Sequence, residues 1–358
     1  MTALSSVGDR LARSSVRSIA LLACATMLAA ACGGSASTGS SGKNLRFAFF
    51  AASSQNGFDA AIYQGAIQEA DKLLGHNNYS MRLFDGQFSA TTQFNQVQSA
   101  AAAKQYDGAI IEPNDNVGIA PAVGQAIKSG IKFCTTLFPI GPDMGSLQPQ
   151  VDGLTCTAAN PPAPGAQLQA QQVIKFCADK NPCRVVTIIG QLQFPFDKLR
   201  YDTWVNTLKP YPNIQIVATG QGNYDRNTSL TQMTNILQAH PQFEVLLSNG
   251  DQHIEGAQIA LQNHGWDLKS LVAANKLYII GSGATQESVT AIRAGLWNAT
   301  LAFYPVTNGQ LAMQQLINAL QGKSYNKAID MDSLSPLPLI LTKQVLDQHS
   351  DFTGQWSG

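Results

Sequence analysis

The sequence contains few residues whose types and spacing could support catalysis. The segment GSGATQ at 281–286 follows an apolar run and is similar to a G-x-G-x-x-G dinucleotide turn, but it lacks the third glycine. Its two glycines also suit a tight turn from a strand into a helix. The five histidines are scattered along the chain, and no P-loop, H-E-x-x-H or G-x-S-x-G motif is present. We therefore expect no cofactor, and an enzyme is the least favoured class of protein.

A cysteine, Cys32, stands where an apolar run gives way to a Gly/Ser-rich stretch. Arginines precede the apolar residues 19–31, which is the layout of a secretory signal peptide over residues 1–31. The apolar run is too short to cross a bilayer. Cys32 therefore resembles the lipid-modified cysteine of bacterial lipoproteins, and residues 32–43 would be its flexible tether. This predicts an extracytoplasmic protein that is anchored to the outer face of the cell membrane by a lipidated cysteine alone.

Two alternatives stay open at this end of the chain. Lipoproteins favour Leu three residues before the modified cysteine, and that position is Ala29. Ordinary cleavage near Ala31 would leave Cys32 as a free thiol. Cys24, in the sequence LLAC, has the preferred Leu before it but no linker after it.

Four further cysteines lie outside this segment, at positions 134, 156, 177 and 183. An even number of cysteines in an exported protein predicts disulfides. We expect Cys177 to pair with Cys183, because the Asn-Pro turn between them can fold the chain back, and Cys134 to pair with Cys156. The spacings typical of zinc and redox sites are absent from these cysteines, so we expect no metal.

Length and charge narrow the class of protein further. Without residues 1–31, about 325 residues remain, which suits two domains better than one. The formal net charge is zero and only 13% of the residues are charged. Such a chain has no excess of basic residues to attract nucleic acid or an acidic membrane surface. We therefore expect no nucleic-acid partner.

The elements that must position a binding site follow a regular alternation. Short apolar runs alternate with amphipathic segments in two similar halves, which predicts parallel sheets covered by helices. The expected strands lie at 45–51, 79–85, 106–113, 131–137, 151–158, 184–190, 214–220, 244–248, 277–281, 298–305 and 336–342. The expected helices lie at 58–74, 90–104, 119–129, 166–179, 197–208, 230–239, 253–264, 286–294 and 307–320.

An ordered set of segments makes the chain resemble the type I periplasmic binding proteins, the ribose- and rhamnose-type sugar receptors of ABC transporters. The segments that carry the resemblance lie at 55–70, 106–115, 122–133, 222–261 and 291–305. The resemblance implies an α/β fold of two Rossmann-like lobes joined by a three-segment hinge. One lobe would hold residues 44–160 plus 304–335, and the other residues 161–303 plus 336–358.

The same resemblance implies a ligand cleft at the carboxyl ends of the strands, where such sheets bind ligands. The residues it places there are Asn56, Phe58, Phe138, Phe194, Lys198, Tyr224, Asn249, Asp251 and Phe303. Three of them have a simpler explanation: Asn56 and Asp251 suit helix N-termini, and Lys198 suits a solvated helix face. Lys198 takes the position of an arginine that binds sugar hydroxyls in the family, and Arg200 is the neighbouring cation.

At several positions where the family has polar residues that bind the ligand, this sequence has other residues, and this bears on the kind of ligand. Carboxylates that usually follow two of the strands are replaced by Leu137 with Phe138 and by Ser282 with Gly283, and a polar amide is replaced by Phe303. Unpaired buried hydroxyls cost about 1–3 kcal/mol each, so this cleft suits a solute smaller or less polar than a free hexose. We expect a monomeric receptor for a sugar, polyol or related solute that partners an ABC permease. The alternative is a sensor that presents the solute to a membrane signalling protein.

Overall fold

The computed structural model describes residues 44–358. The signal peptide, Cys32 and the tether that the sequence predicts lie outside these residues. No helix within residues 44–358 is long and apolar enough to cross a membrane.

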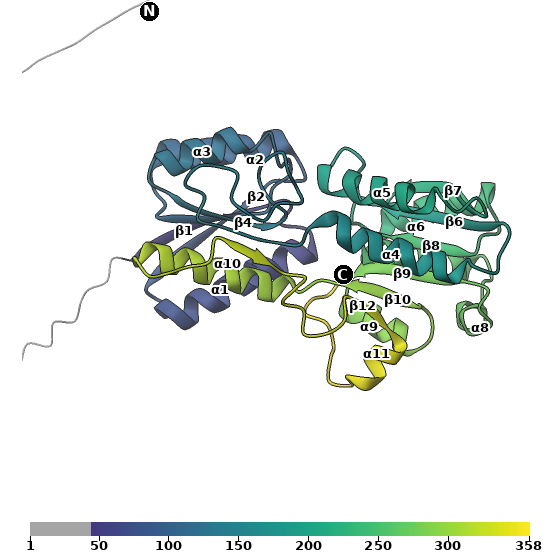
Figure 1. Cartoon of the computed structure of the whole chain (residues 1–358). Helices are drawn as coiled ribbons and strands as arrows, with labels where there is room; N and C mark the ends of the chain where they lie inside the picture. Colours follow the sequence, from purple (N-terminus) through teal and green to yellow (C-terminus); the bar gives the residue numbers. More distant parts are fainter. Residues whose placement is uncertain (1–43) are drawn as a thin grey trace, which may run out of the picture. The chain divides into compact units, whose positions relative to one another are not determined.

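The first lobe is a sheet with strand order β2-β1-β3-β4-β5-β11, in which every neighbouring pair is parallel. Its strands are β1 (Leu45–Ala51), β2 (Tyr79–Asp85), β3 (Gly108–Ile111), β4 (Lys132–Leu137), β5 (Cys156–Ala159) and β11 (Ala328–Asp330). Its helices are α1 (Gly57–Leu74), α2 (Ala90–Ala103), α3 (Ala120–Lys128) and α10 (Pro305–Leu320). Figure 1 shows α2 and α3 on one face of this sheet and α1 and α10 on the other.

The second lobe repeats this plan with strand order β7-β6-β8-β9-β10-β12, in which only β12 is antiparallel to its neighbour. Its strands are β6 (Cys183–Ile189), β7 (Ile214–Gln221), β8 (Val245–Ser248), β9 (Tyr278–Gly283), β10 (Ala299–Ala302) and β12 (Ile340–Thr342). Its helices are α4 (Pro162–Phe176), α5 (Pro195–Leu208), α6 (Arg226–Ala239), α7 (Asp251–Asn263), α8 (Leu268–Ala273), α9 (Gln286–Arg293) and α11 (Lys343–Gln348). The α/β fold class predicted from the sequence is confirmed.

Each sheet is buried on both faces, which explains the continuous apolar runs of its central strands. Helices α1 and α10 close one apolar core of the first lobe and α2 and α3 the other. In the second lobe α4 and α5 cover one face, and α6, α7 and α9 cover the other. Helices cover the two faces of each sheet, so polar residues that bind a ligand are expected in the loops at the carboxyl ends of the strands.

The chain passes between the two sheets at three places. It leaves the first sheet after β5 and enters α4, leaves the second sheet after β10 and enters α10, and runs from β11 back to β12. Both expected disulfides are present: Cys134–Cys156 joins paired positions of β4 and β5, and Cys177–Cys183 closes the turn between α4 and β6. Three short elements, β11, α8 and α11, are not among the elements that the sequence predicts.

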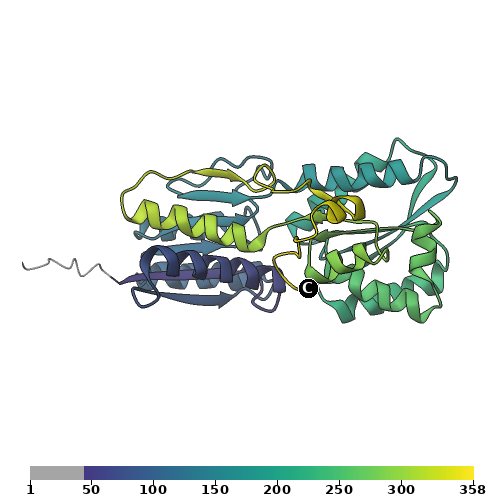
Figure 2. The ribbon, with the colours of Figure 1, turned by 90° about the horizontal axis from the view of Figure 1, so that it is seen from below.

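Helices α1 and α10 pack closely because each presents a glycine to the other. A Cβ atom at Gly65 would lie 2.0 Å from the Val306 carbonyl oxygen, and a Cβ at Gly309 would lie 1.9 Å from the Ile62 carbonyl oxygen. Figure 2 shows the two helices side by side along the first lobe. The glycines thus set the spacing of the two helices that lead into the expected cleft.

We predict that Gly65→Ala destabilises the protein by at least ~2 kcal/mol, because the methyl group forces the two backbones apart. Gly124→Ala is the matched control, since a Cβ at Gly124 in α3 would meet nothing closer than 3.7 Å and alanine favours a helix by up to ~1 kcal/mol. Urea unfolding of the two variants measures the difference. Equal midpoints for Gly65→Ala and Gly124→Ala would refute the close helix contact.

Candidate functional site

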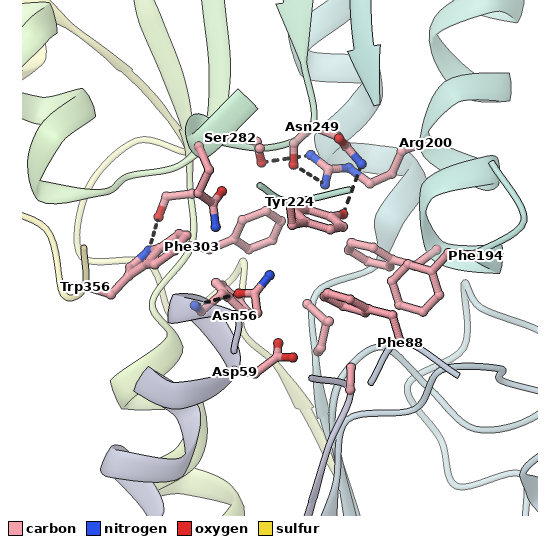
Figure 3. Close-up of a pocket in the computed structure, with 17 residues that line it drawn as sticks. Asn56, Asp59, Phe88, Phe194, Arg200, Tyr224, Asn249, Ser282, Phe303 and Trp356 are labelled. Atoms are coloured by element: carbon pink, nitrogen blue, oxygen red, sulfur yellow. Dashed lines mark hydrogen bonds between the residues drawn. The ribbon is translucent and has the colours of Figure 1, made fainter. Parts of the chain in front are cut away.

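A cavity lies where residues that follow the strands of both sheets meet (Figure 3). The first lobe contributes Ala52, Asn56, Phe58, Asp59, Phe88 and Leu137 to its wall. The second lobe and the segments after it contribute Phe194, Phe196, Arg200, Tyr224, Asn249, Gly250, Gln252, Ser282, Gly283, Phe303 and Trp356. The cavity is partly open to solvent, and its volume is about 40 Å³.

Arg200 is the buried cation of this cavity, with only 2% of its surface exposed. It donates from Nη1 to the Asn249 carbonyl oxygen (3.0 Å) and from Nη2 to Ser282 Oγ (2.8 Å). Its guanidinium also lies over the rings of Phe196 and Phe303, at 5.3 and 5.6 Å from their centroids. None of the carboxylates in the part of the chain that the structure describes forms an ion pair with it. Burial lowers the pKa of Arg200, and nearby acidic groups oppose this shift.

Asp197 holds the adjoining wall in place. Its carboxylate accepts hydrogen bonds from the Tyr224 hydroxyl, from Asn249 Nδ2 (2.6 Å) and from the Gln191 backbone N–H (2.7 Å). Burial raises the pKa of Asp197 to about 6, and these hydrogen bonds hold it from rising further. Because its oxygens are used within the protein, Asp197 positions Tyr224 and Asn249 rather than facing the cavity itself.

The backbone of Tyr224 has a positive φ of 55°, which is unusual for an aromatic residue. The ring of His253 stabilises this turn, because His253 Nε2 accepts from the Tyr224 N–H (2.9 Å) while its Nδ1 bonds to Ser248 Oγ (3.0 Å). Burial lowers the pKa of His253 to about 3, so its ring is neutral and Nε2 can accept. Gly190 leaves room for the tyrosine, since a Cβ there would lie 2.3 Å from the Tyr224 ring.

The first lobe contributes two polar groups at the start of α1. Asn56 caps this helix, with its Oδ1 accepting from the Phe58 N–H at 2.8 Å, and its Nδ2 has no acceptor among the described residues. Asp59 Oδ2 accepts from the Ser53 N–H (2.7 Å), and no other hydrogen bond to its side chain is formed within residues 44–358. Burial raises the pKa of Asp59 to about 7, the Ser53 bond lowers it, and the charge of Asp85 raises it.

Aromatic rings join the two lobes around these polar groups. Phe88 stacks on Tyr224 with ring centroids 5.8 Å apart, and Phe58 meets the edge of Phe303 at 5.9 Å. The cavity therefore combines apolar ring faces with a few fixed polar atoms, which is typical of sites for small molecules.

Six of the residues expected in the cleft line the cavity. They are Asn56, Phe58, Phe194, Tyr224, Asn249 and Phe303. Phe138 is fully buried behind the wall, where it stacks on Phe196 at 5.1 Å, and Leu137 takes the lining position.

Two charged residues expected in the cleft lie elsewhere. Lys198 is half exposed and pairs with Asp202 one helical turn along α5. It lies outside the cavity because residues 197 and 200 occupy the buried face of this helix and residue 198 does not. Asp251 is buried at the start of α7, where its oxygens accept from Thr300 Oγ1 (2.8 and 3.0 Å) and from the Thr285 N–H (3.1 Å). Both carboxylate oxygens of Asp251 thus bond within the second lobe.

Sequence reasoning missed several of the lining residues, among them Asp59, Phe88, Gln252 and Trp356. The i, i+3 spacing of Asp197 and Arg200 could have indicated that Arg200, rather than Lys198, faces inward. Asp59 directly follows Phe58 in the first turn of α1. Acidic residues are favourable in the first turn of any helix, so its position in the sequence does not mark it as a binding residue. No sequence pattern predicts that the C-terminal Trp356 returns to the cavity.

Comparisons with known proteins agree with this fold. Residues 47–324 match the family model described as "Periplasmic binding protein domain". The ribose import binding protein of Bacillus subtilis is 25% identical over 276 residues, which cover 76% of this chain and 81% of that protein. The D-allose-binding periplasmic protein of Escherichia coli is 24% identical and aligns over 66% of this chain and 72% of its own length. A Caulobacter myo-inositol binding protein, solved with myo-inositol, has a TM-score of 0.72 at 21% identity and covers 86% of this chain and 96% of its own.

We predict that Asp59→Asn stabilises the protein at pH 8 and not at pH 4. The folded state raises the pKa of Asp59 from 3.8 to about 7, so the folded protein holds this proton more tightly than the unfolded chain. The stability contributed by that proton is present below pH 4 and is lost as the pH rises to about 7. The asparagine side chain of the variant does not ionise, so the variant does not lose this stability at pH 8.

Thermal unfolding at pH 4, 6 and 8 measures the effect, with the exposed Asp152→Asn as control. A difference between Asp59→Asn and wild type that does not change with pH would contradict the burial of this charge.

Proposed function

Since the chain belongs to the periplasmic binding protein domain family, we propose that it is the extracytoplasmic solute receptor of an ABC importer. It binds a sugar, polyol or related small solute in the cavity between its lobes. The observation that carries this proposal is the buried Arg200, which presents unused N–H donors to a cavity that aromatic rings enclose.

The polar groups of the wall suit a neutral, hydroxylated ligand. Arg200 can only donate hydrogen bonds, whereas the Asp59 carboxylate can only accept them when it is ionised. A hydroxyl group does both, so neighbouring hydroxyls on one solute can satisfy these two residues together. The amides of Asn56 and Gln252, both more than nine-tenths buried, supply further donors and acceptors.

The aromatic rings suit the apolar C–H face of such a solute. Phe88 and Tyr224 approach from opposite lobes, as do Phe58 and Phe303. A planar ring packs well against the C–H face of a sugar ring or polyol, and burial of that face favours binding. The relatives named for ribose, D-allose and myo-inositol all bind polyhydroxylated solutes by name, which supports this class of ligand.

Closure of the lobes about the three crossing segments provides a mechanism for capture. The cavity wall comes from both lobes, and Asn56 and Asp59 lie across the cavity from Arg200 and Asn249 (Figure 3). A solute that contacts both sides adds binding energy to the closed state and shifts the equilibrium toward it. Micromolar affinity, about −8 kcal/mol, is the scale we expect.

The lipid anchor forms part of the proposal. A receptor outside the membrane serves its permease best when it stays nearby, and a lipidated Cys32 with a flexible tether over residues 33–43 would provide this. The lobes 44–160 plus 304–335 and 161–303 plus 336–358 would then act as one monomer on that tether.

We predict that Arg200→Met weakens binding by roughly 10- to 100-fold, because hydrogen bonds to a charged group contribute about 1.5–3 kcal/mol. Thermal-shift and calorimetric titrations with D-ribose, D-allose, myo-inositol, erythritol and glycerol measure the loss. Lys198→Met is the matched control, since it removes a cation two residues away that points out of the cavity.

Circular dichroism establishes that both variants are folded. Equal affinity of the Arg200→Met protein and wild type would remove Arg200 from the site. If no sugar or polyol raises the melting temperature of the wild-type protein, the receptor proposal itself fails.

We predict that Cys32→Ala releases the protein from the membrane fraction of a bacterial host. Mass spectrometry of the wild-type N-terminus should show a diacylglyceryl group on Cys32. Cys24→Ala is the control and should leave the protein in the membrane, because Cys24 then lies within the removed signal peptide. Release by Cys24→Ala instead would assign the lipid to that cysteine.

A further inference from the structure

The last eight residues, 351–358, return from the second lobe to the cavity. They contain no helix or strand, yet Trp356 is only 5% exposed and forms part of the cavity wall. Figure 3 shows its indole at one end of the cavity, beside Phe303 and above the start of α1. A terminal segment without regular structure needs specific contacts to be held in this way.

Hydrogen bonds attach this segment to the second lobe. Trp356 Nε1 donates to the Gly283 carbonyl oxygen at 2.8 Å, and the Trp356 carbonyl oxygen accepts from the Gln286 N–H at 2.9 Å. The terminal Gly358 N–H donates to Glu287 Oε2 at 3.2 Å. The segment therefore runs across the end of β9 and the start of α9.

The same segment contacts the first lobe through two neighbouring side chains. Gln355 exchanges two hydrogen bonds with Thr307 in α10: its Oε1 accepts from the Thr307 N–H (3.2 Å), and its Nε2 donates to Thr307 Oγ1 (2.8 Å). The Trp356 ring meets the edge of Phe58 in α1 at 5.4 Å. Residues 351–358 thus form a strap that touches both lobes.

Glycines on both lobes leave room for this strap. A Cβ at Gly283, where φ is +138°, would lie 2.8 Å from Trp356 Cζ2, and a Cβ at Gly57 would lie 2.5 Å from the Ser357 carbonyl oxygen. The side chains of ordinary residues at these two positions would prevent the strap from lying where it does. The space that Trp356 and Ser357 occupy is therefore provided by residues of both lobes.

We infer that the Trp356 indole is a specificity-determining end wall that restricts the cavity to solutes smaller than a hexose. This inference rests on the proposed function and adds the size of the ligand to it. The indole N–H is already bonded to Gly283, so the side chain offers the ligand apolar surface only. With the indole in place, the space inside is about 40 Å³. Short polyols and small or deoxygenated sugars need less room and fewer polar partners than a hexose, so they suit a small cavity with an apolar end.

The test compares wild type with Trp356→Ala in titrations with glycerol, erythritol, D-ribose, D-allose and myo-inositol. We expect the wild type to prefer the smaller members. In Trp356→Ala we expect the affinity for D-allose or myo-inositol, relative to that for erythritol, to rise at least tenfold. Trp356→Leu, which keeps an apolar side chain but shortens it, is the second variant in case the alanine protein does not fold, and should shift the preference in the same direction.

Trp266→Ala is the matched control, because it removes an indole that packs on Phe243 at 4.9 Å and does not line the cavity. Its ligand preference should equal that of wild type. If wild type binds these solutes and the Trp356 variants keep the same preference, the end-wall inference is overturned while the receptor function stands. If neither wild type nor the variants bind any of the solutes, the proposed function fails and the inference fails with it.

Discussion

A buried guanidinium that forms no ion pair within residues 44–358 is the constraint on which the site depends. A cation in a protein interior is costly unless polar groups surround it, and here they are the Asn249 carbonyl, Ser282 Oγ and the faces of two phenylalanine rings. These contacts use part of the Arg200 donor set, and Arg200 lines the cavity with donors that have no partner within residues 44–358. The second lobe thus carries an incomplete hydrogen-bonding group that a ligand can complete, and the position of α5 on its sheet fixes where that group lies.

The two lobes divide the chemistry unequally. The second lobe holds its polar residues in a connected set, in which Asp197 orients Tyr224 and Asn249, and His253 holds the backbone of Tyr224. The first lobe contributes Asn56 and Asp59, each of which uses one oxygen to bond the backbone beside it and has a second polar atom to spare. In this arrangement a ligand that bonds to Arg200 and to Asp59 would supply a polar link between the lobes.

Periodicity and the order of motifs were enough to predict the fold, because buried parallel strands and amphipathic helices leave strong patterns in sequence. The resemblance also predicted three aromatic residues that line the cavity, Phe58, Phe194 and Tyr224, because each of them follows a strand. The sequence prediction put the inward cation at Lys198 instead of Arg200, because the direction of a side chain on α5 depends on the helical register, which similarity to a family motif does not fix. Trp356 lay beyond prediction, because its place depends on contacts with residues about 50 to 300 positions earlier in the chain.

The charges around the cavity also decide between neutral and anionic solutes. An anion would satisfy Arg200, yet it would face the carboxyl group of Asp59 and lie near that of Asp197 behind the wall, and burial already raises the pKa of both. Adding a further negative charge to that side would raise those pKa values again and would draw protons into the site. A hydroxyl group accepts from the guanidinium and donates to a carboxylate without adding charge. The balance of one unpaired cation against two buried acids therefore favours a neutral polyhydroxylated solute over a carboxylate or phosphate.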